Sequence, residues 1–321
     1  MKILMWDVHG GYTDSLVSGT HSYLFLPPGP DGRGGLARYK GSPPPATREV
    51  TAAELRDDPP DVVVFQRLEE LDIVRRQLGR APGVDLGAIF LEHNTPKTNV
   101  PDTCHPLADM PGLQIVQVTY FNDLLWDCGG TPTRVIEHGI ADPGLRYRGD
   151  LDRLAFVVNE PVRRWRVTGT DLLRSFEGMS IDAFGIDADL LPDALQPSEA
   201  KVSFAGNLSP DALYDELAQR RAYLHLNRWT SLGLSLIQAM LLGLPVVVLD
   251  ATEASRAVPR EAGALSSDVT ELVGAARTLL QDPEEAAFRG RNARRAALAR
   301  YGIARFLADW DSAFADAALS Q

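Results

Sequence analysis

The sequence has little cysteine, no excess of positive charge and no apolar run long enough to cross a membrane. Only Cys104 and Cys128 occur in 321 residues, which is typical of a reducing compartment and excludes a disulfide framework, although the two could pair with each other. The net charge of −11 argues against general binding of nucleic acid or anionic membrane, since both need a positive field. The N-terminus lacks the features of a signal peptide. We therefore expect a cytoplasmic protein.

Short apolar runs alternate with amphipathic stretches along the whole chain, and this alternation predicts parallel sheets covered by helices. Because 321 residues exceed the usual size of one hydrophobic core, we expect two domains. The charged, glycine-containing segment at 138–153 is interpreted as the linker. The predicted class is α/β with two Rossmann-like doubly wound domains that face a cleft. Their expected ranges are 1–148 and 149–302.

The last stretch, 303–321, is expected to form a helix that packs back on the first domain. Phe306, Leu307 and Trp310 recur at helical spacing and form its expected buried face. The arginines between Arg289 and Arg305 are interpreted as a solvated helix face.

The most informative stretch, "NRWTSLGLSLIQAMLLGLPVVVL", begins at Asn227. It predicts a turn, a buried helix over Leu234–Leu242 that Gly243 ends, and a buried strand "VVVL". The turn "TSLG", with Thr230 or Ser231 as a possible N-cap, would present backbone N–H groups to an anion. From these residues alone, an ordinary strand–turn–helix of a doubly wound sheet is an equally good interpretation.

The stretch resembles the donor-binding half of family-4 glycosyltransferases of the GT-B fold. The positions that follow the family's pattern in register are Gly233, Leu234, Ala239, Met240, Gly243, Pro245 and Val246. Three further segments resemble the family and extend the likeness over nearly the whole chain. They are "KVSFAGNLSPDALYDELAQRRAYLHL", "VIEHGIADP" and "FLEHNTP".

The resemblance implies transfer of a sugar from a nucleotide diphosphate sugar to an acceptor, with retention and without a protein nucleophile. No metal or other cofactor is expected. A soluble small-molecule acceptor is expected, because no long basic amphipathic helix is present. Asp187-Ala188-Asp189 has the form of a metal motif but is interpreted as a solvated turn. The nucleotide base, the sugar, the acceptor and the oligomeric state stay open.

The resemblance also assigns roles to residues. On the donor side, arginines after the strand at 154–158 and the glycine turn would hold the diphosphate: Arg163, Arg166, Ser231, Leu232 and Gly233. Arg164 is expected to point away. The donor sugar and nucleotide would contact Thr230, Leu234, Gln238 and Gly206, with Gln238 on the ribose. The reacting side would be lined by His93, His9, Gly10 and Gly11.

Two positions depart from the family, because its two glutamates are replaced by Thr230 and Gln238. Gln238 keeps an acceptor oxygen, so it can still recognise ribose hydroxyls. Thr230 is shorter and uncharged, which leaves the sugar contacts open. The alternatives are therefore a non-catalytic or degenerate nucleotide-sugar-binding protein and a GT-B-type epimerase or hydrolase.

Overall fold

The computed structural model describes residues 1–27, 35–39, 42–196, 198 and 200–319. The chain forms two compact units, one of Met1–Gly139 with Ile303–Gln321 and the other of Ile140–Gly302. The boundary between the units, at Gly139 and Ile140, falls inside the segment 138–153 that was interpreted as the linker, and the rest of this segment is bonded within the second unit. The amides of Arg146 and Tyr147 donate to the carbonyl of Leu242, and Asp142 pairs with Arg294.

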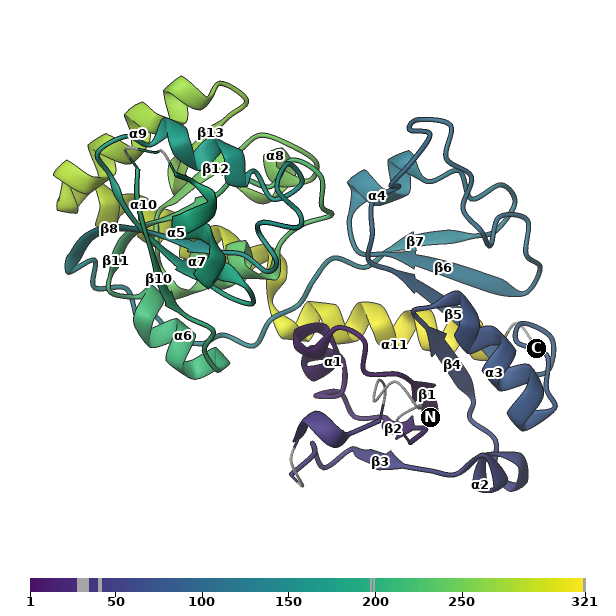
Figure 1. Ribbon diagram of the computed structural model, residues 1–321. Helices are drawn as coiled ribbons and strands as arrows, with labels where there is room; N and C mark the ends of the chain where they lie inside the picture. Colours follow the sequence, from purple (N-terminus) through teal and green to yellow (C-terminus); the bar gives the residue numbers. More distant parts are fainter. Residues whose placement is uncertain (28–34, 40–41, 197, 199, 320–321) are drawn as a thin grey trace. The chain divides into compact units, whose positions relative to one another are not determined.

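The first unit is a seven-stranded parallel sheet in the order β3-β2-β1-β4-β5-β6-β7 (Figure 1). The strands are β1 (Lys2–Met5), β2 (Ser22–Phe25), β3 (Thr47–Glu49), β4 (Val62–Phe65), β5 (Gly87–Glu92), β6 (Leu113–Gln117) and β7 (Thr133–Val135). The helices are α1 (Gly10–Leu16), α2 (Ala52–Asp57), α3 (Leu68–Leu78), α4 (Tyr120–Leu125) and α11 (Ile303–Leu319), with the 3-10 turn η1 (Ala37–Tyr39).

Side chains of each strand alternate between two apolar layers, as the pleat requires. Val62 and Val64 of β4 belong to a core shared with α1 and α11, whereas Val63 and Phe65 pack on the opposite face against α3. Helix α11 buries Phe306, Trp310 and Phe314 completely in the first of these cores, and Leu307 packs beside them.

The second unit is a six-stranded parallel sheet in the order β10-β9-β8-β11-β12-β13. Counted within the unit, this is 3-2-1-4-5-6, the strand order of a Rossmann fold. The strands are β8 (Leu151–Val157), β9 (Ser180–Phe184), β10 (Lys201–Gly206), β11 (Arg220–His225), β12 (Val246–Leu249) and β13 (Gly263–Ser266). The helices are α5 (Leu191–Ala194), α6 (Pro210–Leu217), α7 (Leu234–Leu242), α8 (Ala254–Ala257), α9 (Val269–Gln281) and α10 (Pro283–Tyr301), with the 3-10 turns η2 (Thr170–Ser175), η3 (Ala188–Leu190) and η4 (Arg260–Ala262).

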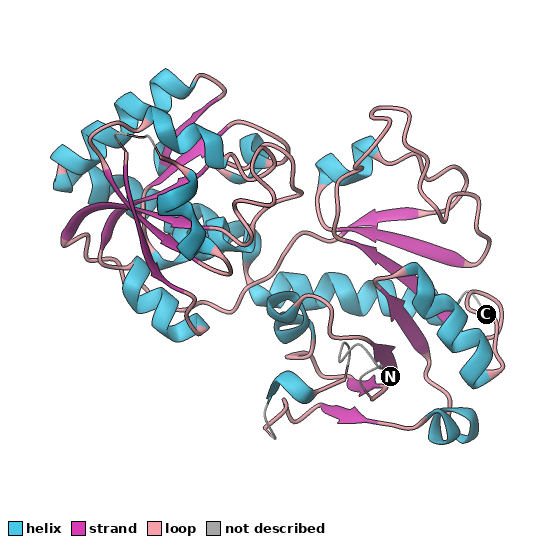
Figure 2. Ribbon diagram, viewed as in Figure 1, coloured by secondary structure: helices cyan, strands magenta, loops and turns pink. Residues whose placement is uncertain are grey.

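Helices cover both faces of this sheet (Figure 2). Val246 and Val248 of β12 pack with α7 and α10, and Val247 packs on the other face with α9. Helix α7 spans the residues expected from the sequence and ends at Gly243, which adopts φ 92°. Its apolar side chains from Leu236 to Leu242 are buried, so α7 is a fixed support for the turn before it.

The structure also bears on the expectations for the cysteines, the Asp-Ala-Asp segment, the loop at 26–45 and the C-terminal arginines. Cys104 and Cys128 are free thiols. Asp187 and Asp189 are exposed at the start of η3, as expected of a turn. The expected loop at 26–45 lies partly outside the described residues. Of the C-terminal arginines, Arg291 and Arg295 are exposed as expected, whereas Arg294 is largely buried between Asp142 and the carbonyl of Leu241.

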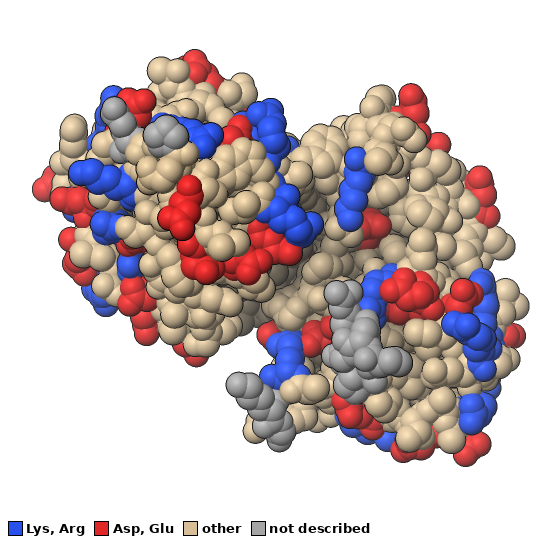
Figure 3. All heavy atoms as spheres, viewed as in Figure 1, with Lys and Arg blue, Asp and Glu red and all other residues tan. Residues whose placement is uncertain are grey.

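Among the described residues, no helix combines the length and apolar character needed to cross a membrane. Acidic and basic side chains are interspersed over the visible face of each unit (Figure 3).

Candidate active site

Each sheet has a point at which successive connections leave in opposite directions, and ligands of such folds bind beyond the strand ends there. In the second unit this point lies between β8 and β11, and in the first unit between β1 and β4. The predicted donor residues follow β8 and β11, and His9 follows β1. His93 follows β5, the neighbour of β4. The donor edge is the strand-end region of the second unit with the predicted donor residues, and the histidine edge is the strand-end region of the first unit with His9 and His93.

The donor edge is built around the turn that leads into α7. Gly233 is the N-cap of this helix and offers no side-chain cap, which corrects the expectation that Thr230 or Ser231 caps it. The first N–H groups of a nine-residue helix therefore have no side-chain acceptor in the cap. Leu232 is buried, and the carbonyl of Ser231 accepts a hydrogen bond from Thr252 Oγ1 at 3.3 Å.

His225, the last residue of β11, fixes the backbone of this turn. A Cβ atom on Gly233 would lie 2.8 Å from His225 Cε1, so no larger residue fits at Gly233 without displacing the buried ring. Burial lowers the pKa of His225 to about 4, and the imidazole is neutral at pH 7. Its Nε2 lies 3.4 Å from Asn227 Nδ2.

Gln238 and Ser235 of α7 are each held by a tyrosine. Gln238 Nε2 donates to the hydroxyl of Tyr214 at 3.1 Å, which leaves the amide oxygen as an acceptor. The Tyr223 hydroxyl donates to Ser235 Oγ at 2.9 Å. Gly206 ends β10 with φ 132°, and a Cβ atom there would lie 2.9 Å from Leu208.

Two of the three arginines after β8 have carboxylate partners. Arg163 is paired with Glu160, and Arg166 lies 3.1 Å from Asp171. Arg164, expected to point away, has no ion pair among the described residues. Its pKa is lowered by partial burial and then by the charge of Arg163. Arg164 is therefore the guanidinium of this loop that lacks a carboxylate partner within the described part of the chain.

A fourth arginine, Arg228, lies next to this loop and was missed by the sequence analysis. It donates to both oxygens of Asp171 at 2.6 and 2.9 Å, and its backbone N–H donates to Val167. Its place directly after Asn227 in the glycosyltransferase-like motif was the available signal. His225 was also missed, although its position at a strand end could have indicated it.

The histidine edge begins with an oriented imidazole. Gln66 Nε2 donates to the carbonyl of Trp6 at 2.7 Å, so the Gln66 oxygen faces His93 Nε2, 3.0 Å away. Nε2 must then carry the proton. Desolvation, with smaller contributions from His9 and His138, lowers the pKa of His93 well below its usual value. His93 is thus a neutral imidazole whose Nδ1 is unprotonated.

Two further rings pack on His93, and a third ring packs on one of these two. The ring of His9 lies 4.0 Å from the His93 ring, centroid to centroid, and that of Tyr12 lies 4.9 Å away. Tyr12 also contacts His138 at 5.7 Å. Desolvation lowers the pKa of His9, although Glu92 and Asp7 act in the opposite direction. His9 keeps an exposed part, which makes it the accessible imidazole of the pair.

Glu92, Gly10 and Gly11 lie near the rings of the histidine edge in the sequence but do not belong to the ring cluster. Glu92 does not join the rings, because its carboxylate accepts from the amide of Asn94 and lies 3.3 Å from His105 Nε2. Gly10 and Gly11 were expected in a ligand-accessible loop, but they form the first turn of α1. The guanidinium of Arg38 covers Gly10, where a Cβ atom would lie 3.4 Å from it.

Within the described ranges, no group of three or more His, Cys, Asp or Glu residues is arranged to hold a metal ion. The donor edge therefore combines backbone N–H groups, arginines and neutral polar side chains. The histidine edge combines neutral imidazoles and tyrosine.

Known structures share this architecture at low sequence identity. Sucrose-phosphate synthase from Thermosynechococcus elongatus superimposes with a TM-score of 0.73 and 12% identity, over 100% of both chains. HepE from Anabaena in complex with UDP-glucose superimposes with a TM-score of 0.70 and 15% identity, over 98% of this chain and 100% of that one. The fold is GT-B.

A third GT-B structure, TarM from S. aureus in complex with fondaparinux, α-GlcNAc-glycerol and UDP, gives a TM-score of 0.63 at 14% identity. That match covers 82% of this chain and 58% of TarM. The family model of glycosyl transferases group 1 matches residues 184–282. The resemblance stated from the sequence is confirmed over this part of the GT-B fold, which includes the turn and α7. No curated protein matches the sequence.

Proposed function

We propose that the protein is a glycosyltransferase that uses a nucleotide diphosphate sugar. The observation that carries this proposal is the start of α7 at Gly233, which has no side-chain cap and follows β11, the strand next to β8 and its arginine-containing loop, at the switch point of a Rossmann-like sheet. Backbone N–H groups and guanidinium groups together suit a diphosphate. The matches to the family model over 184–282 and to GT-B structures support the same proposal.

The residues of the donor edge suggest specific roles. Arg164 contributes charge to the diphosphate, since Arg163 and Arg166 already have carboxylate partners. Gln238 offers its oxygen to the ribose hydroxyls, and Asn227 beside His225 lies along the donor. As the glycosidic bond breaks, negative charge grows on the departing phosphate, and fixed positive groups stabilise it.

The chemistry proposed is transfer with retention. The bond between the anomeric carbon and the phosphate oxygen breaks, the acceptor oxygen bonds to that carbon, and the departing phosphate takes the acceptor proton. The electron pair of the broken bond stays on the phosphate, so no protein nucleophile is needed. His93 and His9 serve as neutral hydrogen-bonding groups on the acceptor side.

A nucleotide-sugar-binding protein without transfer activity is the second candidate. It is favoured by Thr230 and Gln238, which stand where related sequences have glutamates, and by the bond that already engages Gln238 with Tyr214.

The first experiment is thermal and chemical denaturation with UDP, GDP, ADP and TDP and their sugars, without and then with Mg²⁺. A nucleotide at 100 times its dissociation constant should raise the free energy of unfolding by about 2.7 kcal/mol. Arg164→Ala should reduce that response more than Arg163→Ala. If no nucleotide stabilises the protein, the proposal is wrong. Binding without sugar release or transfer would favour the second candidate.

A further inference from the structure

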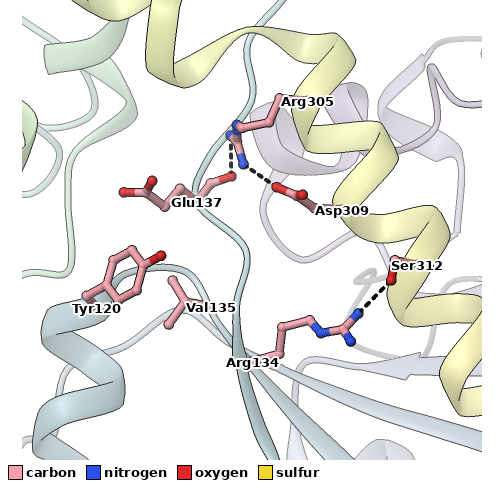
Figure 4. Close-up of a pocket in the computed structure, with 7 residues that line it drawn as sticks. All are labelled: Tyr120, Arg134, Val135, Glu137, Arg305, Asp309 and Ser312. Atoms are coloured by element: carbon pink, nitrogen blue, oxygen red, sulfur yellow. Dashed lines mark hydrogen bonds and ion pairs between the residues drawn. The ribbon is translucent and has the colours of Figure 1, made fainter.

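The first unit contains a cavity that the proposed function does not use. It has a volume of about 360 Å³, within the range of small-molecule sites. The end of β7, the start of α4 and one side of α11 form it (Figure 4). Its lining residues are Tyr120, Arg134, Val135, Glu137, Arg305, Asp309 and Ser312.

This pocket adjoins the histidine edge. Glu137 directly precedes His138, whose ring contacts Tyr12. Arg305 donates to the backbone oxygens of Glu137 and His138 at 2.9 and 2.6 Å. Burial raises the pKa of the Tyr12 hydroxyl, and the hydrogen bond from Trp310 and the charge of Arg305 oppose this rise.

The pocket is lined by two positive side chains, Arg134 and Arg305, and two negative ones, Glu137 and Asp309. Arg305 donates to Asp309 at 2.6 Å, and Arg134 donates to Asp316 at 2.5 Å and to Ser312 at 3.3 Å. Both guanidiniums are thus held in place by carboxylates of α11, on the side of the pocket opposite Tyr120 and Val135 (Figure 4). An anion would have to compete with carboxylates that are already bound.

A neutral hydroxylated molecule meets no such competition. Its hydroxyl hydrogens can be donated to Asp309 and Glu137, and its oxygens can accept from the remaining guanidinium N–H groups and Ser312. Tyr120 is 45% exposed and presents an aromatic wall, against which the apolar face of a sugar ring can pack. The guanidiniums are pre-oriented, so little side-chain entropy is lost on binding.

We infer that this pocket binds a neutral sugar or polyol, as part of the acceptor. The assignment as acceptor rests on the proposed function, whereas the preference for a neutral polyhydroxylated ligand rests on the pocket alone.

The test is NMR of the full chain with ¹⁵N-labelled arginine, which follows the Nε–H resonances of Arg134 and Arg305. The probes are glucose, galactose, mannose, myo-inositol and glycerol, with glucose 6-phosphate as the charged comparison. At least one neutral probe should shift both resonances saturably. Asp309→Asn should weaken that binding about tenfold, since it removes a charged acceptor. Tyr120→Leu, which keeps an apolar side chain without the ring, should also weaken it.

The matched control is Glu285→Gln, because Glu285 and Arg289 form an i, i+4 ion pair on α10 like that of Arg305 and Asp309 on α11. This control should leave sugar binding unchanged. Glucose 6-phosphate binding more tightly than every neutral probe would overturn the inference, and so would the absence of a response to all neutral probes.

UDP stabilisation measured on the same samples separates the two proposals. Stabilisation by UDP without any sugar response would refute the pocket and leave the transferase proposal standing. A sugar response that Asp309→Asn weakens, without any nucleotide binding, would support the pocket as a sugar site and refute the transferase proposal.

Discussion

The donor edge and the histidine edge occupy equivalent places on two parallel sheets, yet backbone groups form the first and side chains form the second. At the donor edge, the backbone of the turn at Gly233 forms the surface, and the ring of His225 packs against this turn. At the histidine edge, the surface is formed by side chains: the rings of His9 and Tyr12 pack on His93, and the ring of His138 packs on Tyr12. Access to a backbone surface requires that no side-chain atoms cover it, whereas a ring cluster functions only if its rings are correctly oriented. Each edge therefore has its own most sensitive substitution.

The largest expected effect is a pH dependence of stability from His225. Its pKa is about 4 in the folded protein against 6.5 ordinarily, so the unfolded chain takes up a proton first as the pH falls. The free energy of unfolding therefore falls as the pH drops from about 6.5 towards 4, by about 3 kcal/mol in total. Chemical denaturation of the wild type and His225→Gln at several pH values measures it. Parallel pH profiles for the two proteins would contradict the prediction.

Gly233→Ala should lower the free energy of unfolding almost as much and should disrupt the donor edge. The new methyl group would lie 2.8 Å from the buried His225 ring, and such overpacking costs about 1–3 kcal/mol. Nucleotide stabilisation should disappear as the turn shifts. The matched control is Gly274→Ala in α9, where a Cβ atom meets nothing within 4 Å. That variant should gain about 0.5–1 kcal/mol. Normal nucleotide binding by Gly233→Ala would show that the turn tolerates a side chain.

At the histidine edge, the corresponding change is Gln66→Leu, which removes the acceptor that orients His93. We expect turnover to fall about 10- to 100-fold through misplacement of the ring, with nucleotide affinity unchanged. The ¹⁵N shifts of the His93 ring should report a change of tautomer. Gln77→Leu, at an exposed position of α3, is the control. If His93 keeps its tautomer in Gln66→Leu, then Gln66 does not orient it.

The smallest effect concerns Gln238. In Gln238→Glu, the carboxylate can accept from the Tyr214 hydroxyl, so nucleotide affinity should change by no more than about threefold. Gln238→Leu removes the acceptor and should weaken nucleotide binding about tenfold. Titration of both variants with UDP compares them. A large gain in turnover by Gln238→Glu would instead indicate a decayed site.

The sequence predicted the helix and strand of the donor edge well, because the residues that specify them are contiguous. Helix α7, its end at Gly243 and strand β12 all follow from one run of residues. The N-terminal part was harder. Strands β2 and β3 are only four and three residues long, and α1 begins with two glycines that have low helix propensity. Packing of Tyr12 and Leu16 into the core holds α1 in place, and a local pattern does not show this.

The side-chain pairings were not predictable from the sequence. Gln66 meets His93 only because β4 and β5 are neighbours in the sheet. Which arginine pairs with Glu160 or Asp171 depends on loop geometry that residue spacing does not encode. His93 was predicted from the family resemblance, whereas its partner Gln66, which directly follows the preceding strand β4, was not predicted.

The return of α11 to the first unit has a consequence for the order in which the chain folds on the ribosome. Gly139 and Phe306 are in such close contact that a Cβ atom on the glycine would overlap the Phe306 side chain, and Trp310 lies at the centre of the first core. The first unit therefore remains without part of its interior until residues 303–319 have been synthesised. The second unit has all of its residues earlier. Domains usually mature in the order of synthesis, but here the unit that begins first is completed last.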